Sequence, residues 1–135
     1  MNDTMGFHLY DKWITNLRAG NKIDIFFEDN LYTTIAVYGY GMIGKQVLAE
    51  LKDTKINVAC VIDKKAGDFD HSSYRIVYPE DIIEYKDVQA IVVTPFDYCA
   101  EIEKDLKERI NNCSTDIISV LSVVEYVNMY GKKYE

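Results

Sequence analysis

The sequence predicts a three-layer α/β fold: a five-stranded parallel sheet of order 3-2-1-4-5 with helices on both faces, preceded by a helical N-terminal extension. From residue 34 onward, short β-branched runs alternate with segments of helical periodicity, which is typical of βαβ units. The strand candidates are continuously apolar, as expected for strands that are covered on both faces. A chain of 135 residues is long enough for one domain with a core of its own. We therefore divide it into an extension, residues 1–33, and an α/β domain, residues 34–135.

The strand candidates are short apolar runs bounded by polar or turn-forming residues. They are residues 34–38, 57–62, 74–77, 90–93 and 116–120. The stretch between the second and third runs is short and rich in Asp, Gly, Ser and Lys, so we expect a loop there rather than a crossover helix.

The helix candidates of the α/β domain each follow a strand. Residues 42–52 repeat Ile43, Val47 and Leu51 on one face, and a helix from Cys99 does the same with Ile102, Leu106 and Ile110. Pro79 followed by two acidic residues predicts a short helix of about two turns. A capping box, Ser122 to Glu125, predicts that the last helix begins at Ser122.

The first 33 residues lie outside this alternation. Apolar residues at helical spacing, ending at Gly20, predict a helix over residues 7–19, and a second short helix is expected over residues 23–28. This extension is too aromatic to remain in water, so it either covers the sheet or joins two subunits. We expect a homodimer with these anchors: Phe7, Tyr10, Trp13, Phe26 and Phe27.

Composition and charge exclude several classes of protein. Fifteen basic against 22 acidic residues give a net charge of −7, which argues against a nucleic-acid partner. The sequence has no secretion signal and no apolar run long enough to span a membrane, so we expect a soluble, cytoplasmic protein. Three cysteines, Cys60, Cys99 and Cys113, lack the spacing of a zinc site or a disulfide framework, and we assign no metal.

A glycine motif carries the functional inference. Residues 39–44, Gly-Tyr-Gly-Met-Ile-Gly, form a G-x-G-x-x-G motif between the first strand and the following helix. The first glycine of such a motif permits a tight turn, the second lets the backbone approach a pyrophosphate, and the third allows close packing of helix on sheet. The helix N-terminus favours the negative charge of the ligand. We therefore predict cofactor contacts from Gly39, Tyr40, Gly41, Met42, Ile43 and Gly44.

Asp63 is the second part of the predicted site. It ends the second strand, 19 residues after Gly44, where its carboxylate can accept hydrogen bonds from a ribose diol. The same carboxylate repels a 2′-phosphate, which favours NAD over NADP. Lys64 and Lys65 follow directly and soften that repulsion.

Two other interpretations of the motif remain open. The glycines can serve turn geometry and packing alone, with Asp63 simply ending a strand. A methyltransferase has similar glycine spacing, but it usually carries an acid just before the first glycine, where this chain has Val37 and Tyr38.

Residues 34–125 resemble the NAD(P)-binding Rossmann domains, and among them the N-terminal domain of the glucose-fructose oxidoreductase/inositol dehydrogenase type. The glycine motif, Asp63 and the phrase Val-Val-Thr-Pro at residues 92–95 carry the resemblance. In that type a strand ending in Thr-Pro passes beside the cofactor, so the resemblance implies contacts from Thr94 and Pro95. Its catalytic Lys and His lie in or near a C-terminal substrate domain, so we expect no dehydrogenase turnover from this chain alone.

The chain is also similar to Rossmann domains of bacterial surface-polysaccharide proteins, including nucleotide-sugar dehydratases and the N-terminal domains of sugar acetyltransferases. Lys12-Trp13-Ile14 and residues 35–41, Ile-Ala-Val-Tyr-Gly-Tyr-Gly, carry this similarity. It implies a nucleotide sugar as an alternative ligand and surface-polysaccharide biosynthesis as the setting.

We therefore expect a Rossmann domain that binds NAD(H), or else NADP or a nucleotide sugar, at the carboxyl ends of the first, second and fourth strands. Two alternatives remain: a minimal oxidoreductase completed at a dimer interface or by a partner chain, and an interaction protein whose pocket binds nothing. No catalytic residue is assigned. Cys99, at a helix N-terminus, is expected to pack in the core. Of the two histidines, His8 lies on the N-terminal extension, and His71, in the loop after Asp63, is expected in water, although it could lie over an adenine or ribose.

Overall fold

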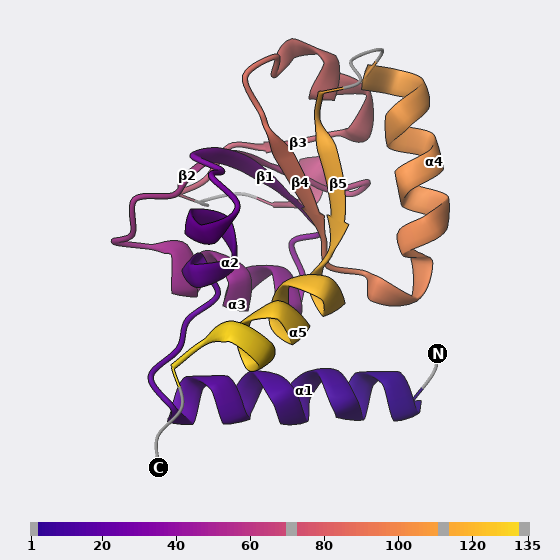
Figure 1. Cartoon of the computed structure of the whole chain (residues 1–135). Helices are drawn as coiled ribbons and strands as arrows, with labels where there is room; N and C mark the ends of the chain where they lie inside the picture. The colour runs from indigo at the N-terminus through magenta and orange to yellow at the C-terminus, as the bar shows by residue number, and fades with distance from the viewer. Residues whose placement is uncertain (1–2, 70–72, 111–113, 133–135) are drawn as a thin grey trace.

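The computed structural model describes residues 3–69, 73–110 and 114–132 (Figure 1). Five parallel strands form one sheet in the order β3-β2-β1-β4-β5, which confirms the predicted topology. The strands are β1 (Thr34–Tyr38), β2 (Asn57–Ile62), β3 (Ile76–Val77), β4 (Ala90–Val93) and β5 (Asp116–Ser119). The strands after β1 are added on one side of β1 as β2 and β3, and then on its other side as β4 and β5. The strand order therefore reverses between β1 and β4.

The helical elements are α1 (Asp3–Arg18), α2 (Asp24–Asp29), α3 (Met42–Leu51), α4 (Cys99–Ile110) and α5 (Val120–Tyr130), together with three 3₁₀ turns, η1 (Ala66–Asp68), η2 (Pro79–Glu84) and η3 (Phe96–Tyr98). The helix after β4 includes the predicted apolar face from Cys99 to Ile110, and the expected loop after β2 contains only the short η1. The segment predicted as a short helix from Pro79 is instead a 3₁₀ turn of six residues.

One predicted helix start is wrong. The last helix begins at Val120, and its N-cap is Ser119, whose hydroxyl accepts a hydrogen bond from the backbone N–H of Leu121 at 3.2 Å. Ser122 therefore lies inside the helix and forms no capping box. The reason is that β5 is one residue shorter than predicted, so the serine that ends the strand also opens the helix.

The two faces of the sheet belong to different apolar clusters, because successive side chains of a strand point to opposite faces. Ile35 and Val37 of β1 pack with side chains of α1, α2, α3 and α5, whereas Ala36 and Tyr38 pack with side chains of η2 and α4. Seven 0%-exposed residues of β1 and β4 show how completely the middle of the sheet is covered: Ile35, Ala36, Val37, Ala90, Ile91, Val92 and Val93. The three-layer arrangement is therefore confirmed.

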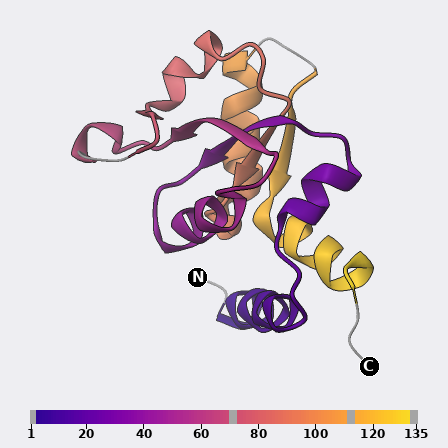
Figure 2. The ribbon, with the colours of Figure 1, turned by 90° about the vertical axis from the view of Figure 1, so that its left-hand side faces the viewer.

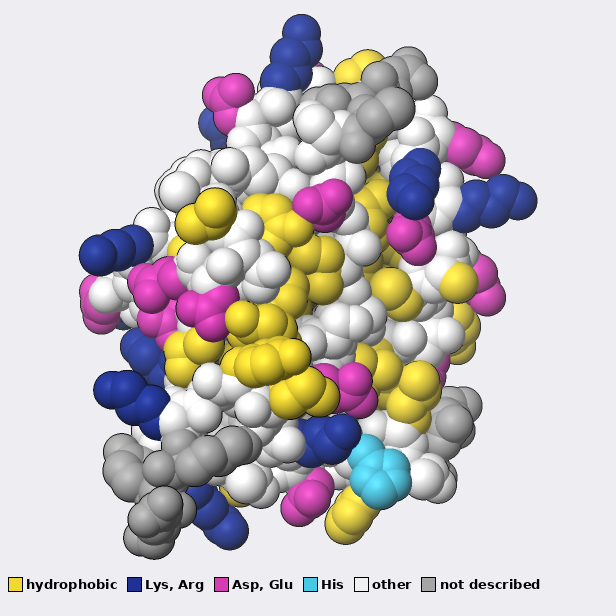
Figure 3. All heavy atoms as spheres, viewed as in Figure 1, with side chains coloured by type: hydrophobic (Ala, Val, Ile, Leu, Met, Phe, Trp, Pro, Cys, Tyr) yellow, Lys and Arg dark blue, Asp and Glu magenta, His cyan; other side chains and the backbone are white. Residues whose placement is uncertain are grey.

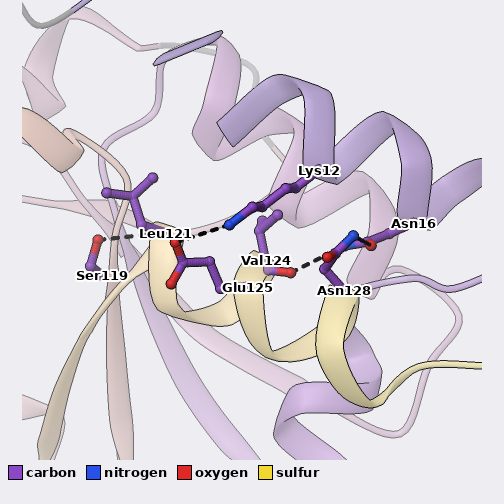
Figure 4. Close-up of polar contacts among 7 residues, drawn as sticks. All are labelled: Lys12, Asn16, Ser119, Leu121, Val124, Glu125 and Asn128. Carbon is purple, nitrogen blue, oxygen red and sulfur yellow. Dashed lines mark hydrogen bonds and ion pairs between the residues drawn. The ribbon is translucent and has the colours of Figure 1, made fainter. Parts of the chain in front are cut away.

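The N-terminal segment packs against this core. Helix α1 lies alongside α5 in both views (Figure 1, Figure 2). The side-chain amide of Asn16 donates to the carbonyl of Val124 at 3.1 Å, and Lys12 pairs with Glu125 at 3.4 Å (Figure 4). The amide of Asn128 donates to the side-chain oxygen of Asn16 at 3.0 Å, which closes the contact at its other end.

A buried carboxylate ties the same segment to α3. Glu50 is 5% exposed and accepts three hydrogen bonds. The indole Nε1 of Trp13 donates at 2.7 Å, the backbone N–H of Ile23 at 3.1 Å, and the amide of Gln46 at 2.8 Å. These donors satisfy a group that would otherwise be costly to bury.

The aromatic side chains of the extension are mostly used inside the chain. Trp13, Phe26 and Phe27 are 3%, 9% and 0% exposed, so these three are not the interface anchors that we expected. Phe7 and Tyr10 remain exposed on α1. The homodimer therefore stays a prediction and rests on fewer aromatic residues than the sequence suggested.

The surface that carries β5 and α5 shows apolar side chains gathered in its middle, with charged side chains mostly around the rim (Figure 3). Partly buried side chains that pack against the core include Ile118 of β5 and Leu121 and Tyr126 of α5. Among the helices of the described residues, none is long and apolar enough to cross a membrane.

Candidate functional site

The glycine loop, residues 39–44, connects β1 to α3 at the carboxyl edge of the sheet. Gly39 has a φ of +102°, a conformation that L side chains rarely adopt, and its N–H donates to the carbonyl of Ile62 at 2.7 Å. A Cβ at Gly39 would also collide with the hydroxyl of Thr94. The first glycine is therefore required by backbone geometry and by the residue that follows β4.

The other two glycines differ from each other. A Cβ at Gly44 would collide with the carbonyl oxygen of Gly39, so this glycine allows α3 to approach the turn. A Cβ at Gly41 would meet nothing within 4 Å. Its φ of −92° and ψ of −161° form extended backbone that any residue can adopt. Nothing in the fold itself demands a glycine at position 41.

Thr94 and Pro95, which follow β4, support the loop from the side. Thr94 is 4% exposed, and its hydroxyl donates to the carbonyl of Tyr38 at 2.7 Å. The ring of Pro95 lies close to Gly39 and lines a cavity beside the loop. The structure thus brings both residues next to the glycine loop, Thr94 as a buried support and Pro95 as part of the accessible surface.

Asp63 also supports the loop. One oxygen of its carboxylate accepts a hydrogen bond from the backbone N–H of Tyr40 at 2.9 Å, and the other accepts from the N–H of Lys65 at 2.8 Å. Each carboxylate oxygen has a second lone pair, so these bonds leave acceptor capacity for a ligand. Asp63 is therefore a structural brace of the loop, and the ligand contact that the sequence suggested stays a prediction.

Tyr40 stands between the loop and the segment after β2. Its ring meets the ring of Phe69 edge to face, with centroids 5.0 Å apart, and the ammonium of Lys45 lies 4.9 Å from its centroid. Met42 is 82% exposed at the start of α3, while Ile43 is half-buried against the core. Of the motif's variable positions, Met42 is thus the one that stands free at the surface.

A cavity of about 900 Å³ opens beside the loop, between the ends of β1, β2 and β4 and the inner side of α4 and η2. Four residues of the predicted site line it: Gly39, Asp63, Lys64 and Pro95. The remaining predicted residues lie outside its lining: Tyr40, Gly41, Met42, Ile43, Gly44 and Thr94. The cavity therefore adjoins the glycine loop on the α4 side of the sheet and does not extend over the first turn of α3.

The far side of this cavity is lined by side chains that no sequence motif selects. They come from β1, η2, η3 and α4 and the residues beside them: Tyr38, Tyr78, Glu80, Tyr98, Glu101, Asp105 and Arg109. The guanidinium Nε of Arg109 donates to a carboxylate oxygen of Asp105 at 3.0 Å. Burial raises the pKa of the Tyr38 hydroxyl, and the negative charges of Asp105 and Asp63 raise it further, so Tyr38 stays protonated at neutral pH.

A comparison with protein families places this site in context. The family model described as C2185-like, N-terminal, matches residues 31–125. The chain belongs to this C2185-like family. The matched range begins just before β1 and ends within α5, so it includes the glycine loop, Asp63 and the cavity and leaves out α1 and α2. No curated protein shows a significant match to the chain.

The cysteine thiols of the described residues in this C2185-like domain are protonated. Burial raises the pKa of the Cys60 thiol to about 12 and also raises that of Cys99, so neither is a thiolate at neutral pH. His8 is exposed on α1. His71 and Cys113 lie outside the described residues. Among the described residues, no group of three His, Cys, Asp or Glu side chains is placed to hold a metal.

The α4 side of the site was missed because its members are not contiguous in sequence. Glu101, Asp105 and Arg109 repeat at a spacing of four residues, which is equally typical of a solvated helix face. That spacing does place them on one side of α4, and this was the available signal. Only the packing of α4 beside η2 turns that side toward the carboxyl edge of the sheet.

Proposed function

We propose that this C2185-like domain binds NAD(H) or a related nucleotide, such as a nucleotide sugar, with the pyrophosphate against the glycine loop and the first turn of α3. The proposal follows the general rule that open parallel sheets bind ligands at their carboxyl edge, where the strand order reverses. In this chain that reversal lies between β1 and β4, and the glycine loop stands at that point.

Gly41 is the observation that carries the proposal. Gly39 and Gly44 are explained by a positive φ and by steric contacts, but neither reason applies to Gly41. A residue without a side chain, with open space where a Cβ would stand, lets a ligand reach the backbone. The N-cap position of Gly41 explains a glycine there less well, since Ser, Thr, Asp and Asn cap helices at least as well.

The local charge also fits an anion at this point. The first turn of α3 contains no acidic residue, and Lys45 follows close behind it. Free N–H groups at a helix N-terminus bind phosphate groups through hydrogen bonds and through the helix dipole. The carboxylates of the cavity wall lie on the α4 side of the sheet, so they do not oppose a pyrophosphate over α3.

Asp63 would contact the adenosine ribose of such a ligand through its remaining acceptor capacity. A carboxylate there favours the free 2′-hydroxyl of NAD over the 2′-phosphate of NADP. Lys64 lines the same cavity and moderates this preference.

The proposal is tested by thermal-shift and calorimetric titration of the chain with NAD, NADH, NADP and ADP. A ligand at 100 times its Kd stabilises the fold by about 2.7 kcal/mol, which is readily measured. Gly41→Val should abolish this shift, because the branched side chain fills the space over the loop. Its melting temperature without ligand should stay within about 5 °C of the wild type, since the backbone at this position accepts any residue.

Gly41→Ala is the graded control, because one methyl group intrudes less and should weaken binding without abolishing it. If Gly41→Val responds to ligand as the wild type does, the nucleotide binds elsewhere. If no nucleotide shifts the wild-type protein, the alternative of an interaction protein with a degenerate pocket replaces the proposal.

A further inference from the structure

The cavity has a second part whose chemistry differs from that of the glycine loop. We call it the α4 wall and define it as Tyr38, Glu80, Glu101, Asp105 and Arg109. Pockets of about 300–1,000 Å³ hold whole small molecules, and the cavity of about 900 Å³ is at the upper end of that range. A pyrophosphate at the loop would leave most of this space to another part of the ligand.

The hydroxyl of Tyr38 supplies a polar group within this wall. The residue is 4% exposed, yet its hydroxyl forms no hydrogen bond to any described residue. No side-chain nitrogen or oxygen among the described residues is both fully buried and unpartnered. The Tyr38 hydroxyl therefore reaches the open space of the cavity, where it can both donate and accept a hydrogen bond.

The charges of the wall select among ligand groups. Glu80, Glu101 and Asp105 carry three negative charges and Arg109 one positive charge, a net of −2. This balance opposes a second phosphate, while the described acids have no arrangement that would hold a metal ion. Carboxylates accept hydrogen bonds from hydroxyl groups, and the Arg109 and Tyr38 side chains donate to hydroxyl oxygens. A group with several hydroxyls matches both kinds of partner.

We propose that the α4 wall binds an uncharged, hydroxyl-rich unit of the ligand, a ribosyl or hexosyl group beyond the pyrophosphate. This inference rests on the proposed function, since the glycine loop is what places the pyrophosphate beside the wall. Tyr38 is the residue next to Gly39, so the two halves of the ligand would be bound by neighbouring positions at the same strand end.

Three probes that share ADP test the proposal by calorimetry. ADP would contact the glycine loop and Asp63, ADP-ribose adds a terminal ribose that can reach the α4 wall, and ADP-glucose adds a hexose there. The wild-type chain should bind ADP-ribose or ADP-glucose about tenfold more tightly than ADP, the gain expected from one or two hydrogen bonds with charged partners. NAD completes the series, because it shares its second ribose with ADP-ribose: tighter binding of both than of ADP-glucose identifies the second ribose of a dinucleotide, and tightest binding of ADP-glucose identifies a nucleotide sugar. Both results support the proposal.

Two variants with matched controls locate the effect. Tyr38→Phe removes only the free hydroxyl, and Glu101→Gln removes one charge from a side chain that has no partner among the described residues. Each variant should bring the affinity for the sugar-bearing probe several-fold closer to the affinity for ADP. The affinity for ADP should stay unchanged. The controls are Tyr130→Phe and Glu108→Gln, an exposed tyrosine of α5 and an exposed glutamate of α4 that do not line the cavity. They should behave as the wild type.

The outcomes separate the inference from the proposed function. Equal Kd values for ADP and all sugar-bearing probes overturn the α4 wall as a sugar site and leave nucleotide binding intact. The wall is likewise excluded as a sugar site if Tyr38→Phe and Glu101→Gln retain the wild-type ratio of affinities. If none of the four probes binds, the proposed function fails and the inference fails with it.

Discussion

The two faces of the sheet are covered unequally, and the difference explains where the cavity lies. Four helices, α1, α2, α3 and α5, contribute to the apolar cluster on one face. The other face has one full helix, α4, and the six-residue turn η2. The crossover from β3 to β4 therefore covers the sheet with a short 3₁₀ turn where a longer helix would fill the layer.

This comparison separates the part of the chain that stabilises the fold from the part available to a ligand. On the face covered by four helices, polar groups are paired internally, as Glu50 is with Trp13, Ile23 and Gln46. On the α4 face, carboxylates and tyrosines line open space beside the glycine loop. Substitutions on the first face should change stability, and substitutions on the second should change binding.

The largest expected effect is on the face covered by four helices. Phe27 of α2 is fully buried, so Phe27→Ala leaves a cavity and should lower the free energy of unfolding by about 3–5 kcal/mol. Phe7→Ala is the control, because Phe7 is 69% exposed and its truncation should cost less than about 0.5 kcal/mol. Urea denaturation of both variants measures the difference. Similar urea midpoints would show that α2 is not part of the cooperative core.

Much of this architecture could be predicted because its signals are local. Continuous apolar runs define the strands, and the position of the glycine motif and of Asp63 follows from the carboxyl ends of β1 and β2. Where two local signals compete, the prediction fails: Ser119 and Ser122 both suit an N-cap, and only the true length of β5 decides for Ser119.

The remaining features depend on long-range packing. Glu50 lies on α3 next to the apolar stripe and is of a residue type usually found at the surface, but Trp13, far away in sequence, buries it. The aromatic extension was ambiguous for the same reason, since nothing local shows whether Phe26 and Phe27 meet their own sheet or a second subunit. A prediction of the cavity would have required the lengths of both η2 and α4, which no local signal gives.

A smaller effect is expected where the two faces meet, at Asp63. Asp63→Asn keeps one acceptor oxygen and loses the charge, so one of the hydrogen bonds from the N–H groups of Tyr40 and Lys65 is lost. We expect the binding free energy of NAD to become less favourable by about 1.5–3 kcal/mol. The preference for NAD over NADP should narrow. Calorimetry with both nucleotides measures this. If the preference stays unchanged while affinity falls, Asp63 acts on the ligand only through the loop.

The smallest expected effect lies at the amino-end edge of the sheet, away from the cavity. The hydroxyl of Tyr32 donates to a carboxylate oxygen of Asp116 at 2.5 Å, joining the segment before β1 to the start of β5. Burial, together with this hydrogen bond and the negative charge of Asp116, raises the pKa of Tyr32 to about 12 from its usual 10.0. The folded state therefore keeps this proton at a pH where the unfolded chain has lost it.

The sign of the pH dependence follows from that raised pKa. The contribution of Tyr32 is fully present below about pH 10 and is lost as the pH rises through about 12. At pH 8, Tyr32→Phe should lower the free energy of unfolding by about 0.5 kcal/mol, the low end for a hydrogen bond because the pair is exposed. The gap between the variant and the wild type should shrink as the pH rises above about 10, and nucleotide affinity should be the same in both. A gap that stays constant from about pH 8 to about pH 11.5 would show that the hydrogen bond does not hold the proton, and a change in affinity would show that this edge is coupled to the cavity.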